Sequence, residues 1–137
     1  MSELTERIDA ALQHGMAIRP QVGGFPVLAE VLRSAGVRTN HWELPSAQST
    51  FVTDDGAVVR QGEPLVTGLV DVLPFNESLL VAALRRDQAG ESTFPEFLEA
   101  TWRAGVTRYT VDFEARTVTY SGYAGQSYEE SYPAVTL

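Results

Sequence analysis

The spacing of apolar residues changes along the chain, and the change predicts helices followed by strands. Residues 2–14 place apolar side chains three and four positions apart, which is the spacing of one helix face. A second helix is predicted from Phe25, where Pro26 fits the first turn because first-turn amides need no partner within the helix. We expect Gly15 to end the first helix and Gly36 to end the second, since glycine readily adopts the left-handed conformation that follows a helix.

Three strands are predicted next. Residues 37–44 form the first, although they alternate poorly when read alone. Their register comes from the second half of the chain, where the residue 69 positions after Trp42 is Val111 in a clearly alternating strand, so Trp42 is predicted to face the core. Residues 48–53 and 57–61 form two more, joined at residues 54–56 by an Asp-Asp-Gly turn typical of a hairpin. The first half is therefore predicted to run helix, helix, strand, strand, strand.

The second half of the chain repeats this plan. Helices are predicted over residues 77–88 and from Phe94, where Thr93 and Glu96 form the T-x-x-E pattern of a capping box. Strands are predicted at residues 109–113 and 117–120, and a last strand carries Tyr128, Glu130 and Tyr132 on one face.

Residues 69 positions apart are often identical or similar, with no gap between the two copies. Because a match this long at one offset indicates an internal duplication, residues 25–68 are predicted to superpose on residues 94–137, in a register that holds to the C-terminus. The identical pairs include Phe25 with Phe94, Gly36 with Gly105, Gly56 with Gly125 and Pro64 with Pro133.

The duplication predicts an α+β fold. The chain has 137 residues, 44% of them hydrophobic, and neither half alone would bury much surface. We therefore expect a single compact domain over residues 1–137, made of two pseudo-symmetric halves (about 1–69 and 70–137) that share one core. The expected architecture is a mostly antiparallel sheet with helices packed on one face. The alternative is a small sheet in each half with the helices between the sheets.

Charge and composition narrow the possible partners. A formal net charge of −8 argues against nucleic acid and anionic membranes, because both are bound through Lys and Arg side chains. The absence of cysteine excludes disulfides and cysteine-ligated metals, and it fits a reducing compartment. No stretch approaches the roughly 18 to 20 apolar residues of a membrane span. We expect a cytoplasmic protein with no nucleic-acid partner and no membrane partner.

One polar cluster is the candidate ligand-binding site. His41 and Glu43 alternate with Trp42, so they are predicted to share the opposite face of their strand, and Ser46 and Gln48 follow closely. The first copy is polar at this point and the second is not. The other interpretation of the same residues is an ordinary solvent-exposed strand.

No catalytic residue, metal site or cofactor is predicted. The only two histidines, His14 and His41, do not have a metal-binding spacing. Neither Ser46 nor Ser49 lies in a G-x-S-x-G nucleophile motif. The Asp54–Gly56 turn lacks the alternating acidic ligands and the distal glutamate of a calcium loop. A non-catalytic role is therefore favoured, and enzymatic activity stays an open question.

Several segments resemble a known family. They are GGFPVLAEVLRSAGV, ELPSAQS, VVRQGEPLVTG and the long stretch that begins RRDQAGESTFPEFLEATWRAGV and ends ESYPAV. Together these segments resemble a bacterial and prophage family catalogued as domain of unknown function 1398, often labelled phage envelope protein. The resemblance covers nearly the whole chain. It implies a phage-related protein and assigns no activity, substrate or catalytic residue.

Two functions follow from these observations. The first is a non-catalytic binding or protein-interaction module resembling phage-derived accessory proteins, whose partner is an unknown protein or small molecule and which is a monomer or a homodimer. The alternative is a small-ligand-binding or enzymatic site at the seam between the two halves, around His41. An apolar cleft in which His41, Glu43 and Gln48 converge would favour the alternative, and a flat surface would favour the first.

Overall fold

The computed structural model describes all 137 residues and contains four helices and six strands. The first half comprises α1 (Glu3–Ile18), α2 (Phe25–Ser34), β1 (Val37–Glu43), β2 (Gln48–Thr53) and β3 (Gly56–Gln61). The second half comprises α3 (Glu77–Gln88), α4 (Phe94–Arg103), β4 (Arg108–Asp112), β5 (Thr117–Ser121) and β6 (Ser127–Ser131). The order helix, helix, strand, strand, strand therefore occurs twice, as predicted. None of the four helices combines the length and apolar character needed to cross a bilayer.

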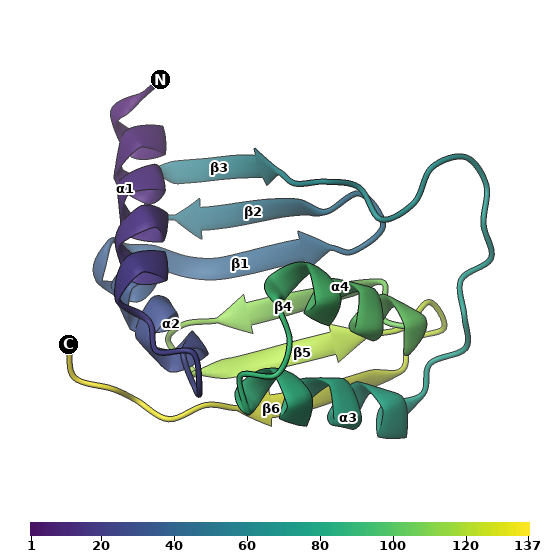
Figure 1. Cartoon of the computed structure of the whole chain (residues 1–137). Coiled ribbons are helices and arrows are strands. Elements are labelled where there is room, and N and C mark those ends of the chain that lie inside the picture. The colour runs from purple at the N-terminus through teal and green to yellow at the C-terminus, as the bar shows by residue number, and fades with distance from the viewer.

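The six strands form one antiparallel sheet in the order β3-β2-β1-β4-β5-β6. At its centre β1 pairs with β4, and His41 lies directly opposite Thr110, its equivalent in the other half. A pseudo-twofold axis thus passes through the sheet between these two residues. The helices cover one face of the sheet (Figure 1). The predicted α+β fold is confirmed, and the alternative of two separate small sheets is wrong because β1 and β4 join the halves edge to edge.

The core lies between the helices and the sheet, and it draws on both halves. It is one cluster that includes Ile8 and Leu32 from the first pair of helices, Leu80 and Phe97 from the second pair, and Phe51 from β2.

Gly15 does not end α1, which continues to Ile18. A Cβ atom at position 15 would lie 2.5 Å from Cδ1 of Leu28 on α2, closer than real Cβ contacts. Gly15 is therefore a contact point that lets two helices approach closely. Gly36 and Gly105 do follow their helices with positive φ angles, of +97° and +85°, as predicted.

The two copies differ by one residue after their second strands. The β2–β3 turn is tight, with Thr53 opposite Gly56, whereas β5 and β6 close with Ser121 opposite Ser127. Two equivalent backbone hydrogen bonds show this one-residue difference. The amide of Gly62 donates to the carbonyl of Ala47 (2.9 Å), and the amide of Tyr132 donates to the carbonyl of Arg116 (3.0 Å).

Ala47 and Arg116 are 69 positions apart and both have positive φ angles (55° and 56°), but Gly62 and Tyr132 are 70 positions apart. The gapless register predicted to hold to the C-terminus is therefore wrong beyond this turn, because the second hairpin holds one more residue. Gly62 in the first half corresponds to Tyr132 in the second.

Candidate functional site

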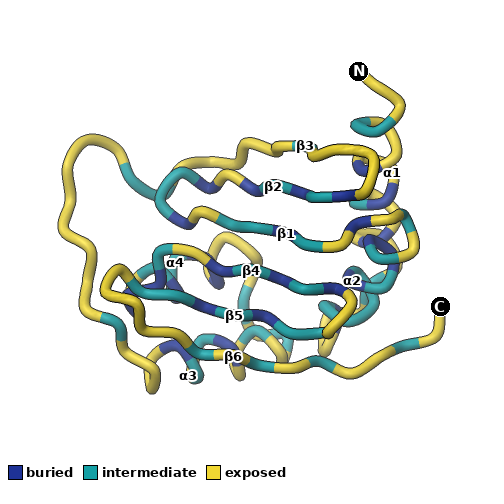
Figure 2. The backbone as a smooth tube through the Cα atoms, turned by 180° about the vertical axis from the view of Figure 1, so that it is seen from behind, coloured by how far each residue is buried: buried dark blue, intermediate teal, exposed yellow.

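The sheet face opposite the helices is uncovered, and we call it the open face (Figure 2). Its side chains form three rows that each cross all six strands, and threonine and serine are the most frequent residues. From β3 to β6, the central row is Val59, Thr50, His41, Thr110, Thr119 and Glu129; the flanking rows are Gln61, Gln48, Glu43, Arg108, Ser121, Ser127 and Ala57, Val52, Thr39, Asp112, Thr117, Ser131.

His41 lies near the centre of the open face and is half-buried by its neighbours. Its Nδ1 is 3.2 Å from Oγ1 of Thr110, across the pseudo-twofold axis, and its Nε2 is 3.1 Å from Oγ1 of Thr39. Both ring nitrogens therefore have hydroxyl partners within the sheet, which fix the plane of the ring.

The other candidate residues lie around His41 without enclosing a space. Glu43 and Gln48 are direct cross-strand neighbours on the open face. Oε1 of Glu43 is 3.9 Å from Nε of Arg108, and both side chains are more than half exposed. Ser46 lies in the turn between β1 and β2, where its carbonyl accepts a hydrogen bond from Nε2 of Gln61 (2.6 Å). The structure brings His41, Glu43 and Gln48 together on a surface and places Ser46 at its margin.

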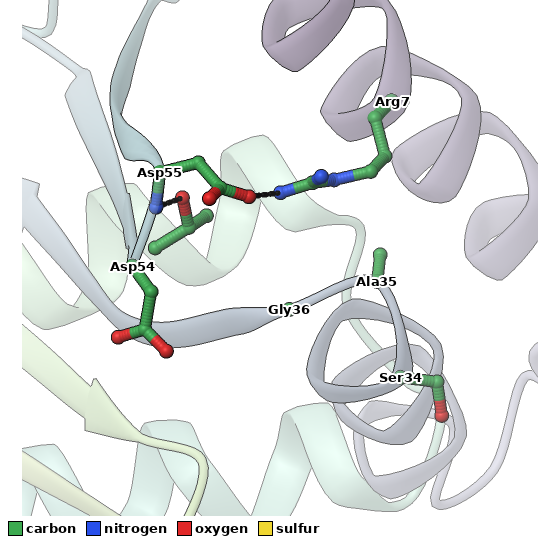
Figure 3. A pocket seen from close by; sticks show the side chains of 7 residues that line it. Arg7, Ser34, Ala35, Gly36, Asp54 and Asp55 are labelled. Carbon is green, nitrogen blue, oxygen red and sulfur yellow. Dashed lines mark hydrogen bonds and ion pairs between the residues drawn. The ribbon is translucent and has the colours of Figure 1, made fainter.

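A polar cleft of about 350 Å³ lies at the other end of the strands (Figure 3). It is lined by Arg7 of α1, the residues that end α2, and the β2–β3 turn. Its charges are already paired, because Nη2 of Arg7 is 3.2 Å from Oδ2 of Asp55, and Nε of Arg38 is 2.6 Å from Oδ1 of Asp54. These exposed pairs contribute little to stability, and only one of the seven residues that line the cleft, Ala35, is hydrophobic. The Asp54–Gly56 segment is a hairpin turn, as predicted.

A second cavity, of about 260 Å³, lies on the helix side of the sheet, and we call it the aromatic cavity. It sits at the seam between the halves, because β1, β3 and the segment after β3 meet the start of α4 there. Its lining includes Trp42, Arg60, Gly62, Leu65, Phe94 and Leu98. Trp42 points to the helix side, as its alignment with Val111 predicts, but it is half-buried rather than enclosed.

Trp42 is held in place by a buried polar group and by two aromatic rings. Its Nε1–H donates to Oδ1 of Asn40 (2.9 Å), and Nδ2 of Asn40 donates to Oγ of Ser49 (2.7 Å). The indole stacks on Tyr109, with ring centroids 5.9 Å apart and an angle of 13° between the planes. It meets Phe94 at 5.1 Å with an interplanar angle of 63°. The indole therefore forms a fixed wall of the aromatic cavity.

Burial changes the acid–base properties of several groups on the helix side. It raises the pKa of Asp87, against the opposing effects of a hydrogen bond from Ser92 and the charge of Arg19. It also raises the pKa of Tyr109 and Tyr120, and it raises the pKa of Tyr132 to about 12. These tyrosines stay neutral at physiological pH and act as packing groups.

No group of three or more His, Asp or Glu side chains is arranged to hold a metal ion. The open face presents hydroxyl and amide groups, and the lining of the aromatic cavity combines aromatic rings with the charged side chains of Arg60 and Glu63. Sequence reasoning missed the aromatic cavity, because the gapless offset of 69 aligns Gly62 with Ser131 and hides its structural equivalence to Tyr132.

Comparison with known proteins places the chain in a family. A family model described as "Protein of unknown function (DUF1398)" matches residues 20–129. Proteins from Mycobacterium bovis and from two strains of Mycobacterium tuberculosis are each 53% identical to this chain over 135 residues, which is 98% of this chain and 82% of theirs. All three are described as uncharacterized proteins. Because the family model covers most of the chain and these relatives match it nearly end to end, the protein belongs to the DUF1398 family.

Proposed function

We propose that the protein is a non-catalytic binding module whose open face binds the same face of a second copy of the chain. The observation that carries this proposal is that helices cover one face of a six-stranded sheet and leave the other uncovered. An antiparallel sheet can leave one face in water, but a broad sheet face with half-buried residues along its middle is also the kind of surface that packs on another sheet.

The charge of the open face favours a second copy. The whole protein carries a formal charge of −8, so two copies repel each other along most approaches. On the open face, Glu43 lies beside Arg108. Oδ1 of Asp112 accepts hydrogen bonds from the amides of Glu114 and Ala115, and the central strands are otherwise uncharged. Face-to-face approach therefore brings few like charges together.

The size of the open face predicts a weak, reversible dimer. Six strands spaced about 4.8 Å apart, with about five residues each, give a surface of roughly 30 Å by 17 Å. A stable interface commonly places about 20–30 residues on each side, and the three rows of the open face fall slightly below that range. We expect a dissociation constant in the micromolar range.

A ligand-binding or enzymatic site around His41 has less support. Its ring nitrogens already have Thr39 and Thr110 as partners. Glu43 and Gln48 surround it on a surface, and neither the polar cleft nor the aromatic cavity is lined by these residues.

Sedimentation velocity over a range of protein concentrations tests the proposal. The wild-type protein should shift from monomer to dimer as its concentration rises. Thr50→Arg, which adds a charge at a half-buried position of the open face, should weaken the dimer by roughly tenfold or more, or about 1.4 kcal/mol. Ala82→Arg is the matched control, because Ala82 is exposed on α3, on the other side of the sheet, and it should leave the association unchanged.

A wild-type protein that stays monomeric at several hundred micromolar would contradict the proposal. So would equal association of the two variants, because then the contact would not involve the open face.

A further inference from the structure

We propose that the aromatic cavity binds a free aromatic amino acid, with its ring beside Phe94, its carboxylate on Arg60 and its ammonium group on Glu63. The cavity lies on the helix side of the sheet, opposite the open face, so this proposal is independent of self-association.

The second half of the protein shows how the equivalent space is used. Tyr132, the equivalent of Gly62, directs its ring onto Phe25, the equivalent of Phe94. The two rings meet edge-on, with centroids 5.1 Å apart and an angle of 86° between their planes. In the first half, Gly62 has no side chain to place against Phe94, and both residues line the aromatic cavity. Trp42, whose equivalent in the second half is Val111, supplies the ring that meets Phe94, and the aromatic cavity lies beside these two rings next to position 62, which has no side chain.

The size and lining of the cavity suit a single ring. A cavity of 150 Å³ in another protein holds benzene, and the volume here is about 260 Å³, which leaves room for the substituents of an amino acid. Trp42 and Phe94 offer ring surfaces for edge-on or offset contacts, which are the preferred geometries of aromatic pairs. Leu65 and Leu98 complete the apolar lining.

Two opposite charges on the cavity lining select a zwitterion. Arg60 faces the helix side, opposite Ser49 on the neighbouring strand, and Glu63 lies just beyond the end of β3. Neither side chain forms an ion pair or a hydrogen bond in the structure. The equivalent of Arg60 in the second half is Glu130, which is paired with Arg85. The unpaired cation is therefore specific to the half that has the cavity, and an amino acid supplies both charges that Arg60 and Glu63 lack.

Isothermal titration calorimetry with L-phenylalanine tests this inference. Phenylacetate, which lacks the ammonium group, and phenethylamine, which lacks the carboxylate, are the matched ligands. We expect L-phenylalanine to bind the wild-type protein at least several-fold more tightly than either. Arg60→Gln should weaken L-phenylalanine binding by roughly tenfold while changing phenethylamine binding little. Glu63→Gln should also weaken L-phenylalanine binding, while it changes phenylacetate binding little.

Gly62→Tyr tests the position of the ring. It places at position 62 the residue type that the second half has at position 132, so the new side chain should fill the cavity and abolish L-phenylalanine binding. A Cβ atom at position 62 would lie 3.0 Å from the carbonyl oxygen of Ala47, which requires a small local shift. Tyr132 is accommodated at the equivalent hydrogen bond. Thermal melting checks that Gly62→Tyr is folded. If it is not, Arg60→Gln still tests the inference, because Arg60 is exposed and its replacement leaves the core unchanged.

Three results would overturn the inference: no heat of binding from the wild-type protein at millimolar L-phenylalanine, unchanged binding by folded Gly62→Tyr, or equal affinity for all three ligands. Thr50→Arg should bind L-phenylalanine like the wild type whether or not the protein dimerises.

Discussion

Replacing Asn40 should reveal how much the structure depends on one buried amide. Asn40 is 5% exposed and lies on the helix side of β1. It accepts from Nε1 of Trp42 and donates to Oγ of Ser49 and to the carbonyl of Thr50. The equivalent residues of Asn40 and Ser49 in the second half are Tyr109 and Val118, so this polar pair occupies core positions that the other copy fills with larger, less polar side chains.

The magnitude follows from the groups that Asn40→Ala leaves without partners. A buried polar group that loses its hydrogen bond costs about 1–3 kcal/mol. Ser49 is fully buried, so its hydroxyl group would have no water to replace the lost partner. Trp42 is half-buried, so water reaches its Nε1 more easily. We expect Asn40→Ala to lower the free energy of unfolding by about 3 kcal/mol, and Ser49→Ala, which removes one of these bonds, by about 1 kcal/mol.

A double-mutant cycle separates the hydrogen bond from the packing. Denaturation with guanidinium chloride, followed by circular dichroism, gives the free energy of unfolding for the wild type, both single variants and the double variant. Because the double variant leaves neither partner unsatisfied, its loss should be smaller than the sum of the single losses by about 1 kcal/mol. Additive losses, or a cost below about 1 kcal/mol for Asn40→Ala, would refute the reasoning.

Two further predictions use internal comparisons. Gly105→Ala should destabilise the protein by at least about 2 kcal/mol more than Gly36→Ala. Both glycines have positive φ angles, which cost an alanine about 1–2 kcal/mol. Only at position 105 would the new Cβ atom meet backbone atoms, because it would lie 2.4 Å from the carbonyl oxygen of Pro74. Equal losses of unfolding free energy in chemical denaturation would contradict this prediction. Burial raises the pKa of Asp87 above its ordinary value of 3.8, so the folded state binds more protons than the unfolded state between the two pKa values, and stability falls as the pH rises through that window. Asp87→Asn should therefore gain stability relative to the wild type as the pH rises above 3.8, and a difference that is constant or of opposite sign in urea melts would show that the Asp87 carboxyl is not destabilised by burial.

Local signals in the sequence predict most of the fold. The Thr93–Glu96 capping box forms in both directions, with the amide of Thr93 donating to Oε1 of Glu96 and the amide of Glu96 donating to Oγ1 of Thr93. This box depends on residues close in the chain. The placement of His41 opposite Trp42 is also correct, but it needed the repeat, which aligns Trp42 with Val111 in the clearly alternating strand of the second half.

Features that depend on distant residues were not predictable in the same way. Gly15 has the sequence appearance of a helix end, but its role is set by Leu28 on another helix. The additional residue in the second hairpin cannot be seen in the sequence, because identical residues beyond the turn, such as Pro64 and Pro133, still lie 69 positions apart. The aromatic cavity brings together Trp42, Gly62 and Phe94, which are far apart in the sequence. Whether the four candidate residues around His41 bind anything stays a prediction.

The strand order also has a consequence for folding. Four of the five strand pairings join consecutive strands, so they need only short loops to close. The pairing of β1 with β4 instead requires closure of the whole chain between Glu43 and Arg108, which costs more conformational entropy. We therefore expect the hairpins of each half to form early and the central pairing to form in the slow step, when the two halves dock. Until then β1 and β4 are both free edges, and a chain interrupted at this stage can pair its exposed central strand with that of another molecule.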